Sequence, residues 1–375
     1  MINKAISNIE FLLVEPVAKT PYPPLGLMKI SSMLKQTNKH CFVFTQVGNE
    51  IPEGLHCPDT IYITSLFTWD IDKVINSVQY YQNKFKDSKI IIGGIAASLL
   101  PDYVYSKTGI KPHVGLLESA EPCFPDYTAT FGRKINYSIS FTSRGCIRSC
   151  NFCHVKTLEP DFFVKHEWEK DIDASFPAIT FWDNNWLASP NFDLDCEKLE
   201  KLNKRVDFNQ GLDARLFDED KAKRLSKINL NPIRFAFDDV YYEKYILKAI
   251  SLAKKYFTSE ISVYVLYNFK DTPEDFFYRI DLLNREKVLS FPMEYRETSE
   301  SKKKLPGKHW DTYLLRGLKL SLLFYYRKGM ITIKRDSFES IYGKDCKEFI
   351  SKLYKIYKYD KSLRKTSKNK DLIAI

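Results

Sequence analysis

Three cysteines stand close together near the middle of the chain: Cys146, Cys150 and Cys153, in the spacing C-x3-C-x2-C. Thiolates spaced in this way can bind three corners of one iron–sulfur cube. Three protein ligands leave the fourth iron open, so that a substrate group can bind there. The pattern therefore predicts an iron–sulfur centre with one open coordination site.

The same residues allow three other interpretations. Residues 150–154 match the C-x-x-C-H signature of c-type haem attachment, which belongs to exported proteins, and the N-terminus has no export pattern. A zinc site would need the adjacent Cys153 and His154 to reach one tetrahedral ion. A thioredoxin-like pair of Cys150 and Cys153 would leave Cys146 without a role. We favour the iron–sulfur cluster, and the alternative is a zinc-stabilised, basic nucleic-acid-binding adaptor without catalysis.

The first third of the chain, which precedes the cysteine loop, has the pattern of a separate α/β domain. Short apolar strands alternate there with amphipathic helices, which is typical of a parallel sheet covered on both faces. The predicted strands are residues 9–14, 41–45, 60–64 and 89–92, and the clearest helices are residues 25–35 and 71–84. We therefore expect a doubly wound, Rossmann-like domain over residues 1–125, with its ligand site at the carboxyl ends of the strands.

A second series of strands begins just before the cysteines. Six apolar runs alternate with helical patterns at intervals of roughly 25–30 residues. The predicted strands are residues 137–142, 178–182, 206–209, 233–237, 261–266 and 289–295, and the helices are residues 196–202, 218–225, 243–256 and 273–284. This order predicts a partial or complete parallel barrel over residues 135–300, with its reactive end at the carboxyl ends of the strands. Thr272 is the expected N-cap of the last of these helices.

The cysteine loop, with Phe152 just before its last cysteine, resembles the signature of the radical S-adenosylmethionine (radical SAM) superfamily. This resemblance implies a partial (βα)6 barrel of the TIM type and a 4Fe-4S cluster. It also implies reductive cleavage of S-adenosylmethionine to a 5′-deoxyadenosyl radical. An electron donor such as flavodoxin or ferredoxin is then the expected partner.

The N-terminal region resembles a second group of landmarks. Residues 23–27 (PPLGL), 91–94 (IIGG) and 118–121 (ESAE) are similar to the cobalamin-binding domain that precedes the barrel in one radical SAM subgroup. The D-x-H-x-x-G motif that supplies a histidine to cobalt in many such domains is absent. The resemblance thus leaves two alternatives, cobalamin bound without a protein histidine or a vestigial lid.

Polar residues follow several of the predicted barrel strands. The resemblance assigns Asp183 to the methionine amine of S-adenosylmethionine, and Arg215 is suited to bind the methionine carboxylate. Gln210, Arg234 and Asp238 complete the predicted cofactor-binding set, with Asp238 on the ribose hydroxyls. Tyr295, after the last strand, is the candidate catalytic residue for a proton or hydrogen-atom relay. For the carboxylates and arginines of this set, helix capping or ion pairing is the competing structural role.

Charge is distributed unevenly along the 375 residues. Residues 301–375 hold 20 Lys and Arg against 7 Asp and Glu, a net +13, whereas the whole chain carries +10. A basic helical C-terminal extension is expected there, after the linker Lys302-Lys303-Lys304, and it favours an RNA or peptide substrate over a neutral small molecule. The sequence holds no apolar run long enough to span a membrane, so we expect a cytoplasmic protein.

Overall fold

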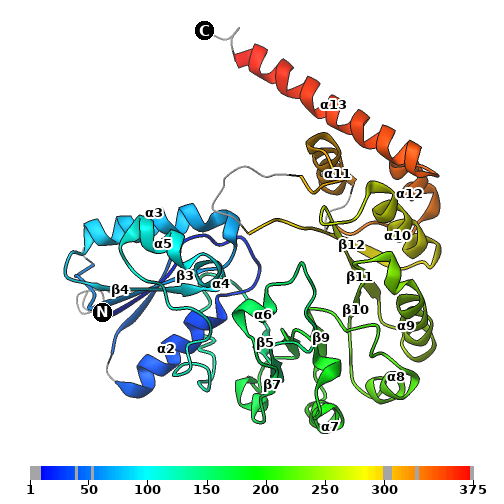
Figure 1. The fold of residues 1–375 in the computed structure, drawn as a ribbon. Helices are drawn as coiled ribbons and strands as arrows, with labels where there is room; N and C mark the ends of the chain where they lie inside the picture. Colours follow the sequence, from blue (N-terminus) through cyan, green and yellow to red (C-terminus); the bar gives the residue numbers. More distant parts are fainter. Residues whose placement is uncertain (1–9, 39–40, 52–54, 299–305, 326–328, 372–375) are drawn as a thin grey trace. The chain divides into compact units, whose positions relative to one another are not determined.

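The computed structural model describes residues 10–38, 41–51, 55–298, 306–325 and 329–371 (Figure 1). Two compact units are present. The first contains the residues up to Trp182 together with Thr298, and the second contains Asp183–Glu297 and the described residues from 306 onward. The linker Lys302-Lys303-Lys304 lies outside the described residues.

The first unit opens with a four-stranded parallel sheet in the order β2-β1-β3-β4. The strands are β1 (Phe11–Glu15), β2 (Val43–Val47), β3 (Thr60–Ser65) and β4 (Lys89–Gly94), and the helices are α2 (Leu25–Thr37), α3 (Ile71–Lys84), α4 (Ile95–Leu99) and α5 (Pro101–Thr108). All four predicted strands and both predicted helices are present. Strand β2 begins two residues later than predicted.

Successive residues of β1 point to opposite faces of this sheet. Leu12 and Val14 pack with the α3 residues Val78 and Tyr81, whereas Leu13 packs with Leu27 of α2. Alternation of this kind places buried side chains on both faces of a strand, as a sheet covered by helices on both sides requires. The helices lie on the two faces of the sheet in Figure 1. The doubly wound arrangement is therefore observed in this part of the chain.

The remainder of the first unit carries the cysteine loop. Strand β5 (Tyr137–Ser140) pairs in parallel with β8 (Ala178–Phe181), and the two-residue strand β6 (Ser143–Arg144) pairs antiparallel with β7 (Phe163–Val164). Helix α6 (Val155–Leu158) and the 3-10 turn η3 (Trp168–Asp171) lie between β6 and β8. The short β6–β7 pair was not predicted.

The second unit contains a parallel sheet in the order β10-β11-β12. Its elements are β9 (Arg205–Phe208), β10 (Ile233–Ala236), β11 (Ile261–Tyr267), β12 (Leu289–Glu294), the helices α7 (Phe192–Leu202), α8 (Glu219–Leu225), α9 (Glu243–Tyr256) and α10 (Pro273–Arg285), and the 3-10 turns η4 (Trp186–Ala188) and η5 (Val240–Tyr242). The six strands predicted after residue 135 thus all form, and the mixed α/β class is confirmed. Their closure into one barrel remains a prediction.

Helix α10 begins as its sequence indicates. The Thr272 hydroxyl accepts a hydrogen bond from the Asp275 N–H at 3.1 Å, and the Asp275 carboxylate accepts one from the Thr272 N–H at 3.0 Å. With Pro273 at the first helical position, this is a complete capping box. Thr272 is therefore a structural residue.

Helices α11 (Thr312–Tyr325), α12 (Arg335–Tyr342) and α13 (Cys346–Asp371) confirm the helical C-terminal region. Helix α13 contacts α10 and α11, and Phe277 of α10 stacks near Phe338 and Phe349 with ring centroids 6.2 and 5.3 Å apart. The C-terminal helices therefore belong to the compact unit that holds α10. The predicted boundaries at residues 125, 135 and 300 do not coincide with the limits of the compact units and remain predictions. Among the described residues, no helix combines the length and apolar character that a membrane span requires.

Candidate active site

The cysteine loop leaves β6 through a tightly constrained glycine. Gly145 has φ +72°, and a Cβ at this position would collide with the carbonyl oxygen of Asp161. Glycine is the residue that adopts this left-handed conformation without strain and fits against a neighbouring backbone. The direction in which the chain enters the loop is therefore fixed one residue before Cys146.

The three thiols differ in exposure. Cys146 is buried, Cys150 is partly buried and Cys153 is exposed. The N–H of Arg148 donates to the Cys146 Sγ at 3.3 Å, and the N–H of Val155 donates to the Cys153 Sγ at 3.5 Å. Backbone donors of this kind orient sulfur ligands around a metal centre.

Three thiols within eight residues are the ligand type that an iron–sulfur cluster needs, so the donor set fits the predicted group. In the part of the chain that the structure describes, no three Cys, His, Asp or Glu side chains converge closely enough to hold a metal ion. The loop thus presents three candidate thiol ligands, and the described residues form no closed metal cage around them.

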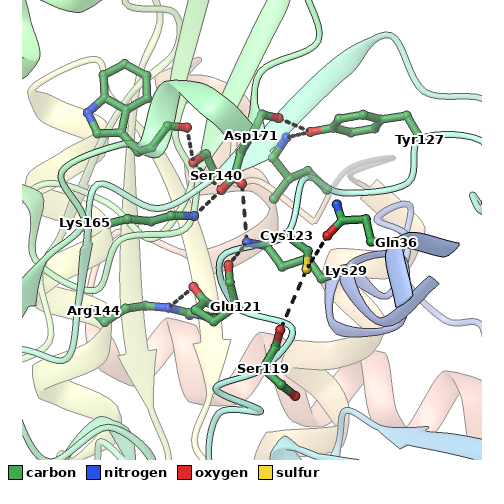
Figure 2. Close-up of polar contacts among 12 residues, drawn as sticks. Lys29, Gln36, Ser119, Glu121, Cys123, Tyr127, Ser140, Arg144, Lys165 and Asp171 are labelled. Carbon is green, nitrogen blue, oxygen red and sulfur yellow. Dashed lines mark hydrogen bonds and ion pairs between the residues drawn. The ribbon is translucent and has the colours of Figure 1, made fainter. Parts of the chain in front are cut away.

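A buried ionic network lies beside the loop in the first unit (Figure 2). Asp171 is 1% exposed, and its carboxylate accepts from Lys165 Nζ at 2.5 Å and Ser140 Oγ at 2.9 Å, with Lys29 Nζ at 3.4 Å. Lys29 also donates to the backbone carbonyl of Glu121 at 2.5 Å. Burial lowers the pKa of Lys29, although Asp171 and Glu121 oppose this shift.

Arg144 joins this network to the cysteine loop. It donates from Nε and Nη2 to the two carboxylate oxygens of Glu121 at 3.2 and 3.0 Å, and from Nη1 to Glu159 at 3.1 Å. Burial raises the pKa of Glu121, but Arg144 and Lys29 outweigh it, so the pKa lies below its usual value. Three cations (Lys29, Lys165, Arg144) face three carboxylates (Asp171, Glu121, Glu159), so the formal charges balance. No sequence pattern indicates Lys29, Glu159 or Asp171.

The predicted cofactor-binding residues lie in the second unit. Asp183 is 3% exposed, and Gln210 is exposed beside Gly211. Arg215 donates from Nε and Nη2 to Asp213 at 2.7 and 3.0 Å and lies 4.8 Å from the Tyr242 ring centroid. Arg215 is therefore held in a defined orientation near the carboxyl end of β10.

Asp213 remains ionised beside this arginine. Burial raises its pKa, but hydrogen bonds from Arg215 and Asn185 and the charge of Arg215 outweigh burial, so the pKa lies below its usual value. Arg234 donates from Nε and Nη2 to Asp207 of β9 at 2.9 and 3.0 Å.

Asp238 and Tyr295 follow β10 and β12, and so lie at the same edge of the parallel sheet. Burial raises the pKa of Asp238 to about 6, even though the charges of Arg279 and Arg215 and the Leu266 N–H lower it. The ring centroids of Tyr295 and Phe269 are 4.7 Å apart, and burial raises the pKa of the Tyr295 hydroxyl. The structure thus brings Asp238 near Arg215, while Arg234 pairs with a residue within β9.

Arg279 is a further residue at this edge that the sequence did not indicate. It is fully buried and donates to the Phe237 carbonyl at 2.8 Å and to Asp271 at 3.0 Å. Because Phe237 immediately precedes Asp238, this arginine fixes the backbone that carries the Asp238 carboxyl group. A buried arginine on an amphipathic helix has no distinguishing sequence pattern, so its role could be recognised only from the structure.

The fold places the chain among parallel α/β proteins, and its structural neighbours are radical SAM enzymes. The chain is similar to the radical S-adenosylmethionine methyltransferase TsrM from Kitasatospora setae, a structure with cobalamin and a 4Fe-4S cluster bound. The TM-score is 0.60 at 12% identity, and the similarity covers 76% of this chain and 75% of that chain. At this identity, the likeness establishes a shared fold.

Other solved structures are less similar. The cobalamin-dependent S-adenosylmethionine radical enzyme OxsB gives a TM-score of 0.47 at 12% identity, covering 77% of this chain and 53% of that one. Streptococcus suis SuiB bound to S-adenosylmethionine gives 0.34 at 15% identity, covering 52% and 48%. No protein-family model and no curated protein sequence matches the chain.

Proposed function

We propose that the chain is a radical SAM enzyme whose 4Fe-4S cluster is held by Cys146, Cys150 and Cys153. The observation that carries this proposal is the C-x3-C-x2-C loop next to parallel strand β5, in a fold shared with TsrM over three quarters of both chains. When bound, the cluster supplies an open iron for S-adenosylmethionine and the electron for its cleavage.

Iron and sulfide analysis of anaerobically reconstituted protein tests the ligand set. The wild type should bind about one cluster, and alanine at any one of the three cysteines should abolish it. Cys57→Ala is the matched control, since Cys57 is an exposed thiol outside the loop. Stoichiometric zinc without iron would refute the proposal and favour the nucleic-acid-binding adaptor.

We propose that Asp183, Arg215 and Asp238 bind S-adenosylmethionine, with Gln210 and Arg234 completing the predicted set. Asp183 would accept from the methionine ammonium group, Arg215 would donate to the carboxylate, and Asp238 would accept from the ribose hydroxyls. The orientation of Arg215 by Asp213 supports this assignment, because a preoriented guanidinium loses less entropy on binding. Tyr295 remains the candidate for a proton or hydrogen-atom relay.

Formation of 5′-deoxyadenosine by the reduced protein tests these roles. Asp183→Asn and Arg215→Met should lower the rate at least about tenfold while leaving the iron content unchanged. Asp220→Asn, at an exposed position on α8, is the control. Unchanged rates in both site variants would show that other residues bind the cofactor.

We propose cobalamin as a second cofactor, bound at the carboxyl edge of the N-terminal sheet. Leu66, Trp69 and Ile95 are 42%, 48% and 45% exposed there, and α4 contacts the 3-10 turn η2 (Thr68–Asp70) that carries Trp69. Exposed apolar side chains at this edge fit the apolar face of a corrin ring, and this is where doubly wound sheets bind ligands. Trp69→Ala should weaken cobalamin binding in a spectrophotometric titration. Tyr105→Ala, an exposed aromatic on α5, should not.

The reaction that we propose is modification of an RNA or peptide substrate, with cobalamin-dependent methyl transfer among the candidate reaction types. The support is the net charge of the C-terminal region, of which Tyr325 and Tyr359 are exposed. Tyr342 is fully buried and serves packing, and Tyr326 lies outside the described residues. Filter binding to RNA at two salt concentrations tests the nucleic-acid class, since phosphate contacts predict an affinity that falls steeply with salt. Mass spectrometry of products formed from methyl-deuterated S-adenosylmethionine distinguishes methyl transfer from rearrangement or oxidation.

A further inference from the structure

Glu159 connects the two ends of the cysteine loop. Its Oε2 accepts from the Gly145 N–H at 2.7 Å, and its Oε1 accepts from Arg144 Nη1 at 3.1 Å. Gly145 immediately precedes Cys146, and Glu159 immediately follows α6, so the segment between them contains all three cysteines. One carboxylate thus closes this segment at its base.

Arg144 is held by more groups than a surface ion pair would provide. Glu121 binds it through both carboxylate oxygens, Glu159 binds a third nitrogen, and the Phe141 ring centroid lies 3.6 Å from the guanidinium carbon. Its side chain is 8% exposed. Planar geometry with several directed donors is specific to arginine, and lysine does not reproduce it.

Burying three cations and three carboxylates gives little net stability, because desolvation offsets their attraction. We therefore interpret this network by the backbone conformation that it specifies. Here the arrangement ends on the Gly145 amide and on the residue before it, where β6 passes into the cysteine loop. The network therefore defines one direction for the chain that carries Cys146.

We infer that Glu121, Arg144 and Glu159 form a clasp that positions the cysteine loop, and that Glu159 is its closing residue. The inference deepens the proposed function, since the positioned thiols are the proposed cluster ligands. The clasp residues are positioning residues, because they act on the cluster through Gly145 and Cys146. Groups that orient metal ligands in this way typically contribute a factor of about 10 to 100 in metal affinity.

Alkylation of the metal-free protein tests the clasp without any cluster. Glu159→Gln presents an amide to Arg144 and should open the base of the loop, so that Cys146 is modified by iodoacetamide at least about tenfold faster. Exposed Cys153 should change much less. Peptide mass spectrometry measures each cysteine separately. Glu167→Gln is the matched control, because the Glu167 side chain is 70% exposed and forms a surface pair with Lys170.

Arg144→Lys is the second variant, and it keeps the charge while removing the planar fork. It should also accelerate Cys146 modification, with a circular dichroism spectrum like that of the wild type. After reconstitution, both clasp variants should lose iron to a chelator about tenfold faster, and the electron paramagnetic resonance spectrum of the reduced cluster should have altered g-values. Loss of global structure alone would not alter the g-values of the cluster that remains bound.

Different results would refute the clasp and the proposed cluster. Cys146 modification at the wild-type rate in both clasp variants would overturn the clasp, whatever the metal content. Absence of iron from the wild type after reconstitution would overturn the proposed cluster, while faster Cys146 modification in the variants would still support the clasp.

Discussion

Replacement of Asp238 by asparagine should strengthen the fold and weaken cofactor binding at the same time. The pKa of Asp238 is about 6 in the fold, against an ordinary value of 3.8, because burial disfavours its ionised form. At pH 7 the group is mostly ionised in both folded and unfolded chains. A shift of about two units then costs the fold at most about 3 kcal/mol, and less where solvent screens the charge.

The direction of the stability change follows from the raised pKa of Asp238. Above pH 6 the folded protein carries a charge that it binds unfavourably, so Asp238→Asn should raise the free energy of unfolding there. Below pH 4 the carboxyl group is protonated in both states, and this advantage should vanish. Urea unfolding of the wild type and the variant at pH 7 and pH 4 measures the difference.

The affinity for S-adenosylmethionine should fall in Asp238→Asn, whereas the free energy of unfolding should rise. The ionised fraction of Asp238 falls from about nine tenths at pH 7 to about one tenth at pH 5, so affinity for S-adenosylmethionine should fall about tenfold if only the carboxylate binds the ribose. Isothermal titration calorimetry of reconstituted protein without reductant measures this change. Asp238→Asn should bind weakly with a flat pH profile.

Asp239→Asn is the control for this experiment. Asp239 caps η5 by accepting from the Tyr241 N–H at 2.9 Å, and asparagine caps helices as well as aspartate does. Because the Asp239 charge helps to raise the pKa of Asp238, this variant should shift the pH profile slightly toward lower pH and keep its slope. Equal wild-type affinity at pH 5 and pH 7, or a wild-type slope in Asp238→Asn, would refute the assignment of Asp238 to the cofactor.

Three further changes test the fold around the site. Burial raises the pKa of Asp126, but hydrogen bonds from Lys35, Ser31 and Thr128 outweigh it and lower the pKa to about 2. Asp126→Asn should therefore lower the free energy of unfolding by about 2 kcal/mol at pH 7, and this difference should shrink toward pH 2. Thr272→Ala should cost about 1 kcal/mol through the lost N-cap, whereas Thr272→Ser should be nearly neutral in thermal unfolding. Gly145→Ala should lower the melting temperature and the iron content together, since its Cβ meets the Asp161 carbonyl. A wild-type iron content in Gly145→Ala would show that the loop tolerates another entry angle.

Regular amphipathic segments were predictable from the sequence alone. The limits of α3 and α9 agree with the predicted residues 71–84 and 243–256, because apolar residues recur there at helical spacing up to clear ends. The predicted limits of strand β2 were two residues too early, because a short apolar run does not determine which of its residues pair with the neighbouring strand.

The candidate site was predictable only where residue type and spacing define chemistry. The three cysteines form such a pattern, and Thr272-Pro273 forms another. Glu159 and Arg279 do not, because their roles depend on partners brought together by tertiary structure. The ion pair of Arg234 with Asp207 on β9 likewise depends on tertiary structure, so residue spacing did not indicate it.

The buried network has a consequence for the order of events during synthesis. Lys29 and Asp171 are separated by 142 positions in the chain, and Glu121 and Arg144 lie between them. Contacts between such distant segments cost more loop-closure entropy than local contacts do. The clasp can therefore close the cysteine loop only after Glu159 has left the ribosome, and the wider network is complete only after Asp171 has followed.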